Sequence, residues 1–397
     1  MDMQTMKRVD RIAGVPLCAL LKAYDRVAGR DGPDPREYLS SIDTPRIGVI
    51  KFWGMGSLIL ASPLFRAIKS AYPSAEVHLI TLSQNKKVIE LLGIADKVHY
   101  LELPEESGYV STSTSILGFF ASLSRIGLHA VIDLEYLSRF SSIVSYLTGA
   151  PIRAGFHSWD VWRGNLQTER RAFNPYWHAT ENFLNLHRAL GKEGGEHPID
   201  LSLSGDEIEK AEELLRSEGV DTGKRTIAVN ANASTIALAR RWPENNFIEL
   251  VDRIVESGLG QVVLLGAPDE APYVEGLKSR MKHKDDVISL AGKSSLTELV
   301  GVLQKADLLV TNDSGPLHLA GALGTSTVSF FGPETPELFG PRGEMHKVLY
   351  RGIDCSPCIN IYNAKTVRCM RDEPECLTRI TVDEAFEAVR SSLEGPA

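Results

Sequence analysis

The feature that most constrains the fold is an alternation of short apolar, β-rich runs with longer helix-like stretches, which starts at residue 46 and occurs twice. This alternation is typical of a parallel sheet with helices on both faces, because parallel strands need a crossover between them. It predicts two doubly wound, Rossmann-like α/β domains. The first set of strand candidates is Arg46–Phe52, Glu76–Leu82, Val98–Leu103 and Ala130–Glu135. The second set is Thr226–Asn232, Gln261–Ala267, Val287–Gly292, Leu308–Asp313 and Thr325–Gly332.

Two domains also suit the length of 397 residues, because single hydrophobic cores stop growing near about 250–300 residues. The alternation weakens between 155 and 174 and then restarts, so we expect domains over 46–200 and 201–380 and a C-terminal helix in 381–397. The proline-rich stretch 31–45 predicts a linker. Ligands of such sheets bind at the carboxyl ends of the strands, so we expect the two domains to face a ligand-binding cleft.

Residues 1–30 carry six basic and three acidic side chains, a local charge of +3 in a chain whose net charge is −8. Apolar residues from Val9 to Leu21 are spaced to share one helical face. One interpretation is an amphipathic helix on an anionic membrane surface, which implies peripheral contact with the inner membrane. The other is a helix that packs on the body of the protein, or a frayed terminus.

The acidic net charge argues against a nucleic-acid-binding protein, which needs a basic surface for phosphates. No apolar run reaches the ~18–20 residues of a membrane span, and no secretory signal is recognisable. We therefore expect a cytoplasmic protein whose thiols stay reduced.

Candidate phosphate-binding residues follow the most apolar strand candidate, where Asp313, Ser314 and Gly315 lead into a helix that reaches about Leu323. A helix N-terminus offers free N–H groups and the positive end of a dipole, which suits a diphosphate. The alternative is an ordinary Asp or Ser cap of the helix.

Two further junctions belong to the same predicted sheet edge. Gly332, Glu334 and Thr335 follow the next strand, and Asn232 and Ser234 follow the first strand of the second domain. Arg240 and Arg241 then precede a helix that begins at Pro243. Arginine grips phosphate oxygens with two parallel hydrogen bonds, although most surface arginines have no such role.

Taken together, these motifs resemble glycosyltransferase family 9, the heptosyltransferase-like enzymes of bacterial surface-glycan assembly. The resemblance implies a GT-B fold and inverting, metal-independent transfer from a nucleotide sugar, often ADP-heptose, to a lipopolysaccharide or similar precursor. It implies donor binding by Arg240, Asp313, Ser314, Gly315 and His318, and by the turn that contains Asp269. It requires no catalytic cofactor. The residues that carry it are Asn312–His318, Leu323–Thr325, Phe331–Thr335 and Arg240–Pro243.

The acceptor half departs from the family at one position. Gly54 and Gly56 form a strand-to-helix turn, and the family typically places an aspartate directly after it, taken to be the catalytic base. Here that residue is Ser57. A neutral serine is a poor base for the acceptor hydroxyl, so either another carboxylate serves or the activity is altered or lost.

The substitute carboxylates are Asp133 and Glu135, at the end of a central strand. Because successive side chains of a strand point to opposite faces, Asp133 and Glu135 lie on the same face of the sheet. We prefer Glu135 as the catalytic base. Arg139 lies one helical turn beyond Glu135 and is a candidate partner for it. His178 lies on a helix near the domain junction and is a further acceptor-side candidate. The alternative for Asp133 is a structural cap or ion pair.

Four of the five cysteines gather near the end of the chain. Cys355, Cys358, Cys369 and Cys376 have a spacing compatible with a structural zinc site. Buried free thiols or a conditional disulfide are the alternatives. For the whole chain, the alternative to an active transferase is a catalytically silent relative that binds the donor or acts as a scaffold.

Overall fold

The computed structural model describes residues 10–28, 32–102, 109–195, 197–199, 201, 203–233, 235–360 and 369–394. The chain divides into two compact units, Met1–Pro198 and Ile199–Ala397. Within the described residues, no helix is both long and apolar enough to cross a membrane.

The first unit is built on a six-stranded parallel sheet in the order β3-β2-β1-β4-β5-β6. This order places the topological switch point between β1 and β4, where ligands of Rossmann-like sheets bind. Two strands were absent from the prediction, β5 and the edge strand β6, because their sequences are interrupted by Arg, Gly and Glu. The strands are β1 (Arg46–Ile50), β2 (Glu76–Leu82), β3 (Lys97–Leu101), β4 (Ala130–Asp133), β5 (Ile152–His157) and β6 (Glu169–Ala172).

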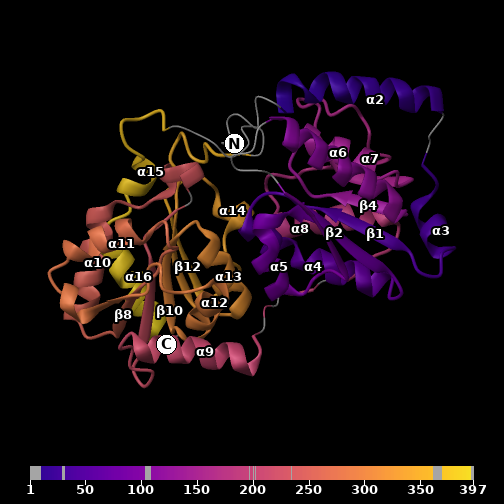
Figure 1. The fold of residues 1–397 in the computed structure, drawn as a ribbon. Helices are drawn as coiled ribbons and strands as arrows, with labels where there is room; N and C mark the ends of the chain where they lie inside the picture. Colours follow the sequence, from indigo (N-terminus) through magenta and orange to yellow (C-terminus); the bar gives the residue numbers. More distant parts are fainter. Residues whose placement is uncertain are drawn as a thin grey trace. The chain divides into compact units, whose positions relative to one another are not determined.

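Helices cover both faces of this sheet. Figure 1 shows α6 and α7 on one side and α4, α5 and α8 on the other. In sheets covered in this way, ligands bind at the carboxyl ends of the strands. The helices are α4 (Met55–Ala71), α5 (Lys86–Leu92), α6 (Tyr109–Ile126), α7 (Arg139–Leu147) and α8 (Ala179–His187).

Two helices precede the sheet. α2 (Gly14–Ala28) packs against α7. The linker prediction for residues 31–45 is wrong in part, because α3 (Pro35–Ser40) forms there. Asp34 caps α3 by accepting a hydrogen bond from the Glu37 N–H at 3.0 Å, Pro35 suits the first helical turn, and Leu39 is buried.

The second unit repeats the architecture with a parallel sheet in the order β12-β11-β10-β7-β8-β9. The predicted GT-B class, with two successive Rossmann-like doubly wound sheets, is confirmed. The prediction missed β12, a half-buried edge strand of mixed polarity. The strands are β7 (Thr226–Asn230), β8 (Gln261–Leu264), β9 (Val287–Ser289), β10 (Leu308–Asn312), β11 (Thr327–Phe331) and β12 (His346–Tyr350).

The core of the second unit continues directly behind its site residues. Trp242 is fully buried and stacks on Phe330 with ring centroids 4.2 Å apart, and its indole N–H donates to the Ile380 carbonyl at 3.0 Å. These contacts fix the segment that carries Arg240. The helices are α9 (Gly205–Ser217), α10 (Glu244–Glu256), α11 (Ala271–Ser279), α12 (Leu296–Lys305), α13 (Gly315–Leu323), α14 (Pro336–Phe339), α15 (Glu375–Thr378) and α16 (Val382–Glu394).

Candidate functional site

Two asparagines organise the carboxyl edge of the second sheet. The amide nitrogen of Asn312, the last residue of β10, donates to the carbonyls of Ala231 and Asn232 at 3.0 and 3.1 Å. Its amide oxygen accepts a hydrogen bond from the backbone N–H of Trp242 at 2.9 Å. Asn230, the last residue of β7, donates to Ser314 Oγ at 3.1 Å. The loops after β7 and β10 and the start of α10 are thereby held together.

Arg240 lies between two buried carboxylates. Its Nε is 3.4 Å from Asp313 Oδ2, and its Nη2 is 3.5 Å from Glu334 Oε2. These residues are 73 and 94 positions from Arg240 in sequence, at the ends of different strands. The structure thus brings together three of the predicted donor-binding residues. The cluster holds one cation against two carboxylates, so it provides acceptors for ligand hydroxyls as well as a cation for phosphate.

The N-terminus of α13 adjoins this cluster. Ser314 occupies the N-cap position, but its side chain makes no capping hydrogen bond; instead its hydroxyl contacts Thr311 Oγ1 at 2.9 Å. The ordinary side-chain cap considered as the alternative is therefore not formed. The N–H groups of Gly315 and Leu317 keep their capacity to bind an anion, whereas Pro316 has no N–H. His318, one turn further along α13, is half-buried.

The loops after β7 and β8 meet at Asn232. This residue is buried, donates to the Leu265 carbonyl at 3.3 Å, and keeps an amide oxygen that has no hydrogen bond among the described residues. A Cβ on Gly266 would lie 3.1 Å from its amide nitrogen, so the glycine permits the close approach. Asp269 is exposed in the same turn. Ser234, the other candidate in the first loop, lies outside the described residues.

Two predicted donor residues have structural explanations. A Cβ on Gly332 would lie 2.7 Å from Leu377 and 2.9 Å from Cys376 Sγ, so this glycine is needed for close packing against α15. Thr335 caps α14 by accepting the Glu337 N–H at 3.3 Å.

A buried ion pair occupies the switch point of the first sheet. Glu135 Oε1 accepts from Lys51 Nζ at 2.9 Å and from the N–H groups of Phe52 and Trp53 at 2.6 and 3.1 Å. The carboxylate therefore holds the loop that leads into α4. Lys51 was missed by the sequence prediction, although a lysine at the end of an apolar strand candidate is a usable signal.

Asp133 lies deeper than Glu135. It is fully buried, accepts from the Ser141 hydroxyl at 2.8 Å, and forms an ion pair with Arg163. Burial raises the pKa of Asp133, and the Arg163 guanidinium opposes that shift. An acceptor hydroxyl has no access to this carboxylate in the structure, which favours the structural alternative. The Arg163 partner, 30 residues away, was not predicted.

The predicted pairing of Arg139 with Glu135 is wrong. Arg139 begins α7 and pairs with Asp10 at 3.4 Å, because Asp10 caps that helix from outside by accepting the Phe140 N–H at 2.8 Å. His178, predicted as an acceptor-side residue, has a structural role: it is the N-cap of α8, and its Nδ1 accepts a hydrogen bond from the Thr180 N–H at 3.3 Å.

The turn after β1 has the geometry expected of a ligand-facing helix start. Gly54 has φ +91°, a conformation that favours glycine, and serves as the N-cap of α4 without a side-chain cap. Gly56 and Ser57 lie in the first turn of α4, which begins at Met55. Ser57, at the position where the resemblance led us to expect an aspartate, is half-buried.

The four clustered cysteines line one small apolar cavity together with Pro333. All are free thiols, and burial raises the pKa of Cys376 to about 11. Among the described residues, however, no three His, Cys, Asp or Glu side chains are arranged to hold a metal ion. The spacing predicted a possible zinc site; the structure brings the four thiols to one cavity, but no metal-binding arrangement is formed among the described residues.

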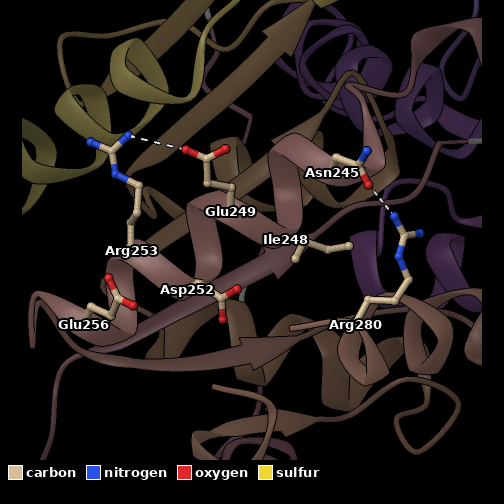
Figure 2. Close-up of a pocket in the computed structure, with 7 residues that line it drawn as sticks. All are labelled: Asn245, Ile248, Glu249, Asp252, Arg253, Glu256 and Arg280. Carbon is tan, nitrogen blue, oxygen red and sulfur yellow. Dashed lines mark hydrogen bonds and ion pairs between the residues drawn. The ribbon is translucent and has the colours of Figure 1, made fainter. Parts of the chain in front are cut away.

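A larger groove lies away from these residues, on the outer face of α10 (Figure 2). Arg253 and Arg280 point toward Glu249 and Asn245, respectively, and the Asp252 carboxylate accepts the Lys282 N–H at 3.1 Å. The polar side chains of this groove thus form ion pairs and hydrogen bonds on a solvated helix face. None of them follows the end of a strand, where ligands of such sheets bind.

The comparisons with known proteins agree on one family. A family model described as glycosyltransferase family 9 (heptosyltransferase) matches residues 117–366. Lipopolysaccharide heptosyltransferase 2 of Salmonella typhimurium is 22% identical over 308 residues, which cover 74% of this chain and 85% of that protein. Lipopolysaccharide heptosyltransferase 1 of Pseudomonas aeruginosa is 26% identical over 290 residues, covering 70% and 77%.

Solved structures share the fold. A family 9 glycosyl transferase from Veillonella parvula has a TM-score of 0.72 at 21% identity, covering 92% of this chain and 99% of that one. E. coli ADP-heptose lipopolysaccharide heptosyltransferase II has a TM-score of 0.68 at 18% identity, covering 88% and 98%. E. coli heptosyltransferase WaaC with ADP-2-deoxy-2-fluoro heptose has a TM-score of 0.63 at 19% identity, covering 87% and 99%. Because the family model matches more than half of its length, the chain belongs to glycosyltransferase family 9.

Proposed function

We propose that the chain is an inverting glycosyltransferase that moves a heptose from ADP-heptose to a lipopolysaccharide or other surface-glycan precursor. Family membership supports sugar transfer in lipopolysaccharide synthesis. The names of the relatives support heptose as the sugar and lipopolysaccharide as the acceptor. The relative solved with an ADP-heptose analogue supports the donor.

The observation that carries the proposal is the cluster of Arg240, Asp313 and Glu334 beside the N-terminus of α13. The proposed donor diphosphate lies on the N–H groups of Gly315 and Leu317 at the start of α13, since Pro316 has none, with Arg240 as the nearby cation. Asp313 and Glu334 are acceptor-only groups when ionised, and they suit sugar or ribose hydroxyls. We also assign donor-side contacts to the other residues that the sequence analysis singled out in the second unit, among which Ser234 lies outside the described residues. These are Asn232, Ser234, Asp269, Ser314, His318 and Thr335.

Inversion requires one displacement. The acceptor oxygen bonds to the anomeric carbon, the bond from that carbon to the diphosphate breaks, and a base takes the acceptor proton. We assign the first unit to the acceptor and Glu135 to the base, with Gly54 and Gly56 shaping the adjoining turn. Developing charge on the leaving diphosphate is met by the α13 amides and Arg240, so the chemistry needs no metal.

A silent, donor-binding relative is the second candidate, and one observation favours it. Ser57 replaces the family aspartate, and the substitute Glu135 already accepts three hydrogen bonds on Oε1. In that case the second unit still binds the donor, whereas transfer fails.

Two measurements separate these candidates. Thermal unfolding with ADP-heptose, ADP and UDP-N-acetylglucosamine tests binding, because a ligand of the folded state raises its stability. Transfer to a lipopolysaccharide precursor lacking heptose then tests activity. Stabilisation by ADP ligands with turnover supports the transferase, and stabilisation without turnover supports the silent relative. The absence of stabilisation by every nucleotide contradicts both.

Separately, we propose that a structural zinc ion binds in the cavity lined by the four cysteines. Cys355, Cys358, Cys369 and Cys376 are suitable ligands by type, but the thiols would have to move closer together to bind it. Such an ion would tie the two ends of the segment 355–376 and take no part in transfer. Elemental analysis of protein purified without chelator tests this, and protein free of zinc and iron contradicts it.

We also propose a cytoplasmic location with peripheral attachment to the inner membrane, where a lipid-linked acceptor would be reached. Cell fractionation tests both parts. Recovery in the periplasm would contradict the first, and recovery only in the soluble fraction would contradict the second.

A further inference from the structure

Four large aromatic side chains are exposed on the two loops that follow β5 and β6. They are Trp159, Trp162, Tyr176 and Trp177, with exposed fractions of 93%, 39%, 85% and 39%. We call these four residues the aromatic platform. Because β5 and β6 are parallel neighbours, both loops leave the first sheet at its carboxyl edge. Ligands of such sheets bind at that edge, so exposed aromatic side chains there indicate a binding surface.

The loop after β6 has a fixed backbone beneath its two aromatic residues. Asn182, which is fully buried in α8, donates to the carbonyls of Asn174 and Trp177 at 2.8 and 3.1 Å. Its amide oxygen accepts the Asn174 N–H at 2.8 Å, and the Asn174 side chain accepts the Tyr176 N–H at 2.9 Å. Because this backbone is already ordered, the loop can present its two rings to a ligand at a small entropic cost.

The loop after β5 is anchored at the strand end that carries the proposed base. Arg163 directly follows Trp162 and forms a buried ion pair with Asp133. Its Nε also donates to Ser142 Oγ at 2.8 Å. Asp133 Oδ1 in turn accepts the backbone N–H of Glu135 at 3.0 Å. The loop that carries this half of the aromatic platform is therefore tied to the backbone of the proposed base.

Aromatic contacts connect the same base with the loop after β6. Tyr136 directly follows Glu135, and its ring packs on those of Phe156 and Phe173, with centroids 5.9 and 5.3 Å apart. Phe173 is the first residue after β6, so it begins the loop that carries the other half of the platform. Packed rings thus lead from the residue beside the proposed base to the start of this loop.

The exposed charges around the platform are balanced. Within 157–177, which the structure describes throughout, Asp160 and Arg170 are the exposed charged side chains. Burial is the largest cause of the lowered pKa of His157, and the charge of Arg170 is the next. The His157 ring contacts that of Trp159 with centroids 5.1 Å apart, so Arg170 adjoins the platform. An anionic lipid surface or a nucleic-acid strand requires a net basic surface, and neither suits this one.

A sugar ring matches such a surface. One face of a pyranose presents C–H groups, which pack on the face of an aromatic ring, whereas its hydroxyls need hydrogen bonds. The tryptophan N–H groups are donors, the Tyr176 hydroxyl is both donor and acceptor, and the Asp160 carboxylate is an acceptor. The platform therefore combines apolar faces with the polar groups that sugar hydroxyls require.

We propose that the aromatic platform binds a sugar ring of the acceptor glycan, stacked on Trp159 and Tyr176, its two most exposed rings. The identity of this ligand rests on the proposed function, in which the first unit is the acceptor side. The anchored loops hold the glycan in a fixed relation to Glu135. The platform thus contributes to the binding of the acceptor and not to that of the donor.

Isothermal titration calorimetry of the full chain tests the platform without the donor. The probe is the lipid-free glycan of the precursor that lacks heptose. Trp159→Ala and Tyr176→Ala should each raise its Kd about tenfold or more, because each removes an aromatic face. Trp159→Phe keeps such a face and should stay within a few-fold of the parent. The proposal is overturned if the glycan does not bind the parent, or binds all these proteins equally.

Controls exclude a loss of structure and a different ligand. Tyr24→Ala, at an exposed tyrosine of α2, should bind the glycan like the parent. Thermal unfolding of Trp159→Ala and Tyr176→Ala should match that of the parent, because both side chains are largely exposed. Co-sedimentation with vesicles of phosphatidylglycerol and phosphatidylethanolamine tests for lipid contact. If Trp159→Ala weakens vesicle binding and leaves the Kd for the glycan unchanged, the platform faces lipid and the proposal is wrong.

Transfer kinetics separate the platform from the proposed function. In an active enzyme, both alanine variants should raise KM for the acceptor about tenfold, with kcat within a few-fold of the parent and KM for ADP-heptose unchanged. Transfer by the parent, with the same acceptor KM in both variants, would contradict the platform and leave the transferase intact. Glycan binding that depends on Trp159, without any transfer, would support the platform and contradict the transferase.

Discussion

Lys51 Nζ lies 2.9 Å from Glu135 Oε1, and this ion pair joins the carboxyl ends of β1 and β4 at the switch point of the first sheet. Both side chains are more than nine-tenths buried. The same carboxylate oxygen accepts two backbone N–H groups of the loop before α4. A residue proposed as the base is therefore also part of the scaffold, and the two roles require separate measurements.

The scaffold role predicts a loss of stability in Glu135→Gln. The variant leaves the Lys51 ammonium buried without an opposite charge, which should lower the free energy of unfolding by about 3–5 kcal/mol. Urea unfolding measures this, with Asp269→Asn as control because Asp269 is exposed. The double variant Lys51→Met with Glu135→Gln should recover a large part of the loss. Equal instability of the single and double variants would show that the charge of Lys51 is not the cause.

The alternation of apolar runs was sufficient to predict two Rossmann-like sheets, because the buried parallel strands β7 and β10 each contain three consecutive apolar residues and β1 is free of polar side chains after Arg46. The missed strands lie at sheet edges or contain charges. β6 reads Glu-Arg-Arg-Ala, and its pairing with β5 is made by backbone groups that leave no apolar pattern. The helix at Pro35–Ser40 was hidden because Asp34 and Pro35 suit a helix start as well as a linker.

The site was predictable where it follows the strand-end rule. Arg240, Asp313 and Glu334 were each placed at one edge by position in the alternation, and the structure brings them together. Partners that lie far away in sequence were not predictable, because no local pattern links Lys51 to Glu135 or Arg163 to Asp133. The proposed roles of these residues remain predictions.

The base assignment predicts different effects of two substitutions on turnover. Glu135→Gln should lower kcat about 10²- to 10⁴-fold when assayed below its unfolding temperature, while affinity for ADP stays unchanged. Ser57→Asp restores the family carboxylate at the start of α4, where the helix dipole stabilises its ionised form. If Glu135 is the base, this second change should leave kcat within a few-fold of the parent. A large gain of activity in Ser57→Asp would instead indicate that the natural chain lacks an effective base.

The donor site predicts weaker binding in Arg240→Met. Loss of the guanidinium removes a charged hydrogen-bond donor and leaves Asp313 and Glu334 to repel the diphosphate, so the Kd for ADP should rise about tenfold to a hundredfold. Isothermal titration calorimetry measures the constant. Arg280→Met, in the groove on α10, is the matched control and should bind ADP like the parent. Similar affinities for all three proteins would remove the main support for the donor site.

His187, at the end of α8, predicts a loss of stability in mild acid. The ring is 2% exposed, and burial is the largest cause of lowering its pKa from 6.5 to about 4. Between these values the unfolded chain binds a proton that the folded chain does not, so the free energy of unfolding decreases as pH falls below about 6.5 and this contribution levels off below about 4. From about pH 7.5 to pH 5 the loss from this residue should be about 2 kcal/mol. His187→Gln should show a pH dependence that is flatter by this amount in urea unfolding, whereas parallel curves for the two proteins would show that the ring is protonated equally in both states.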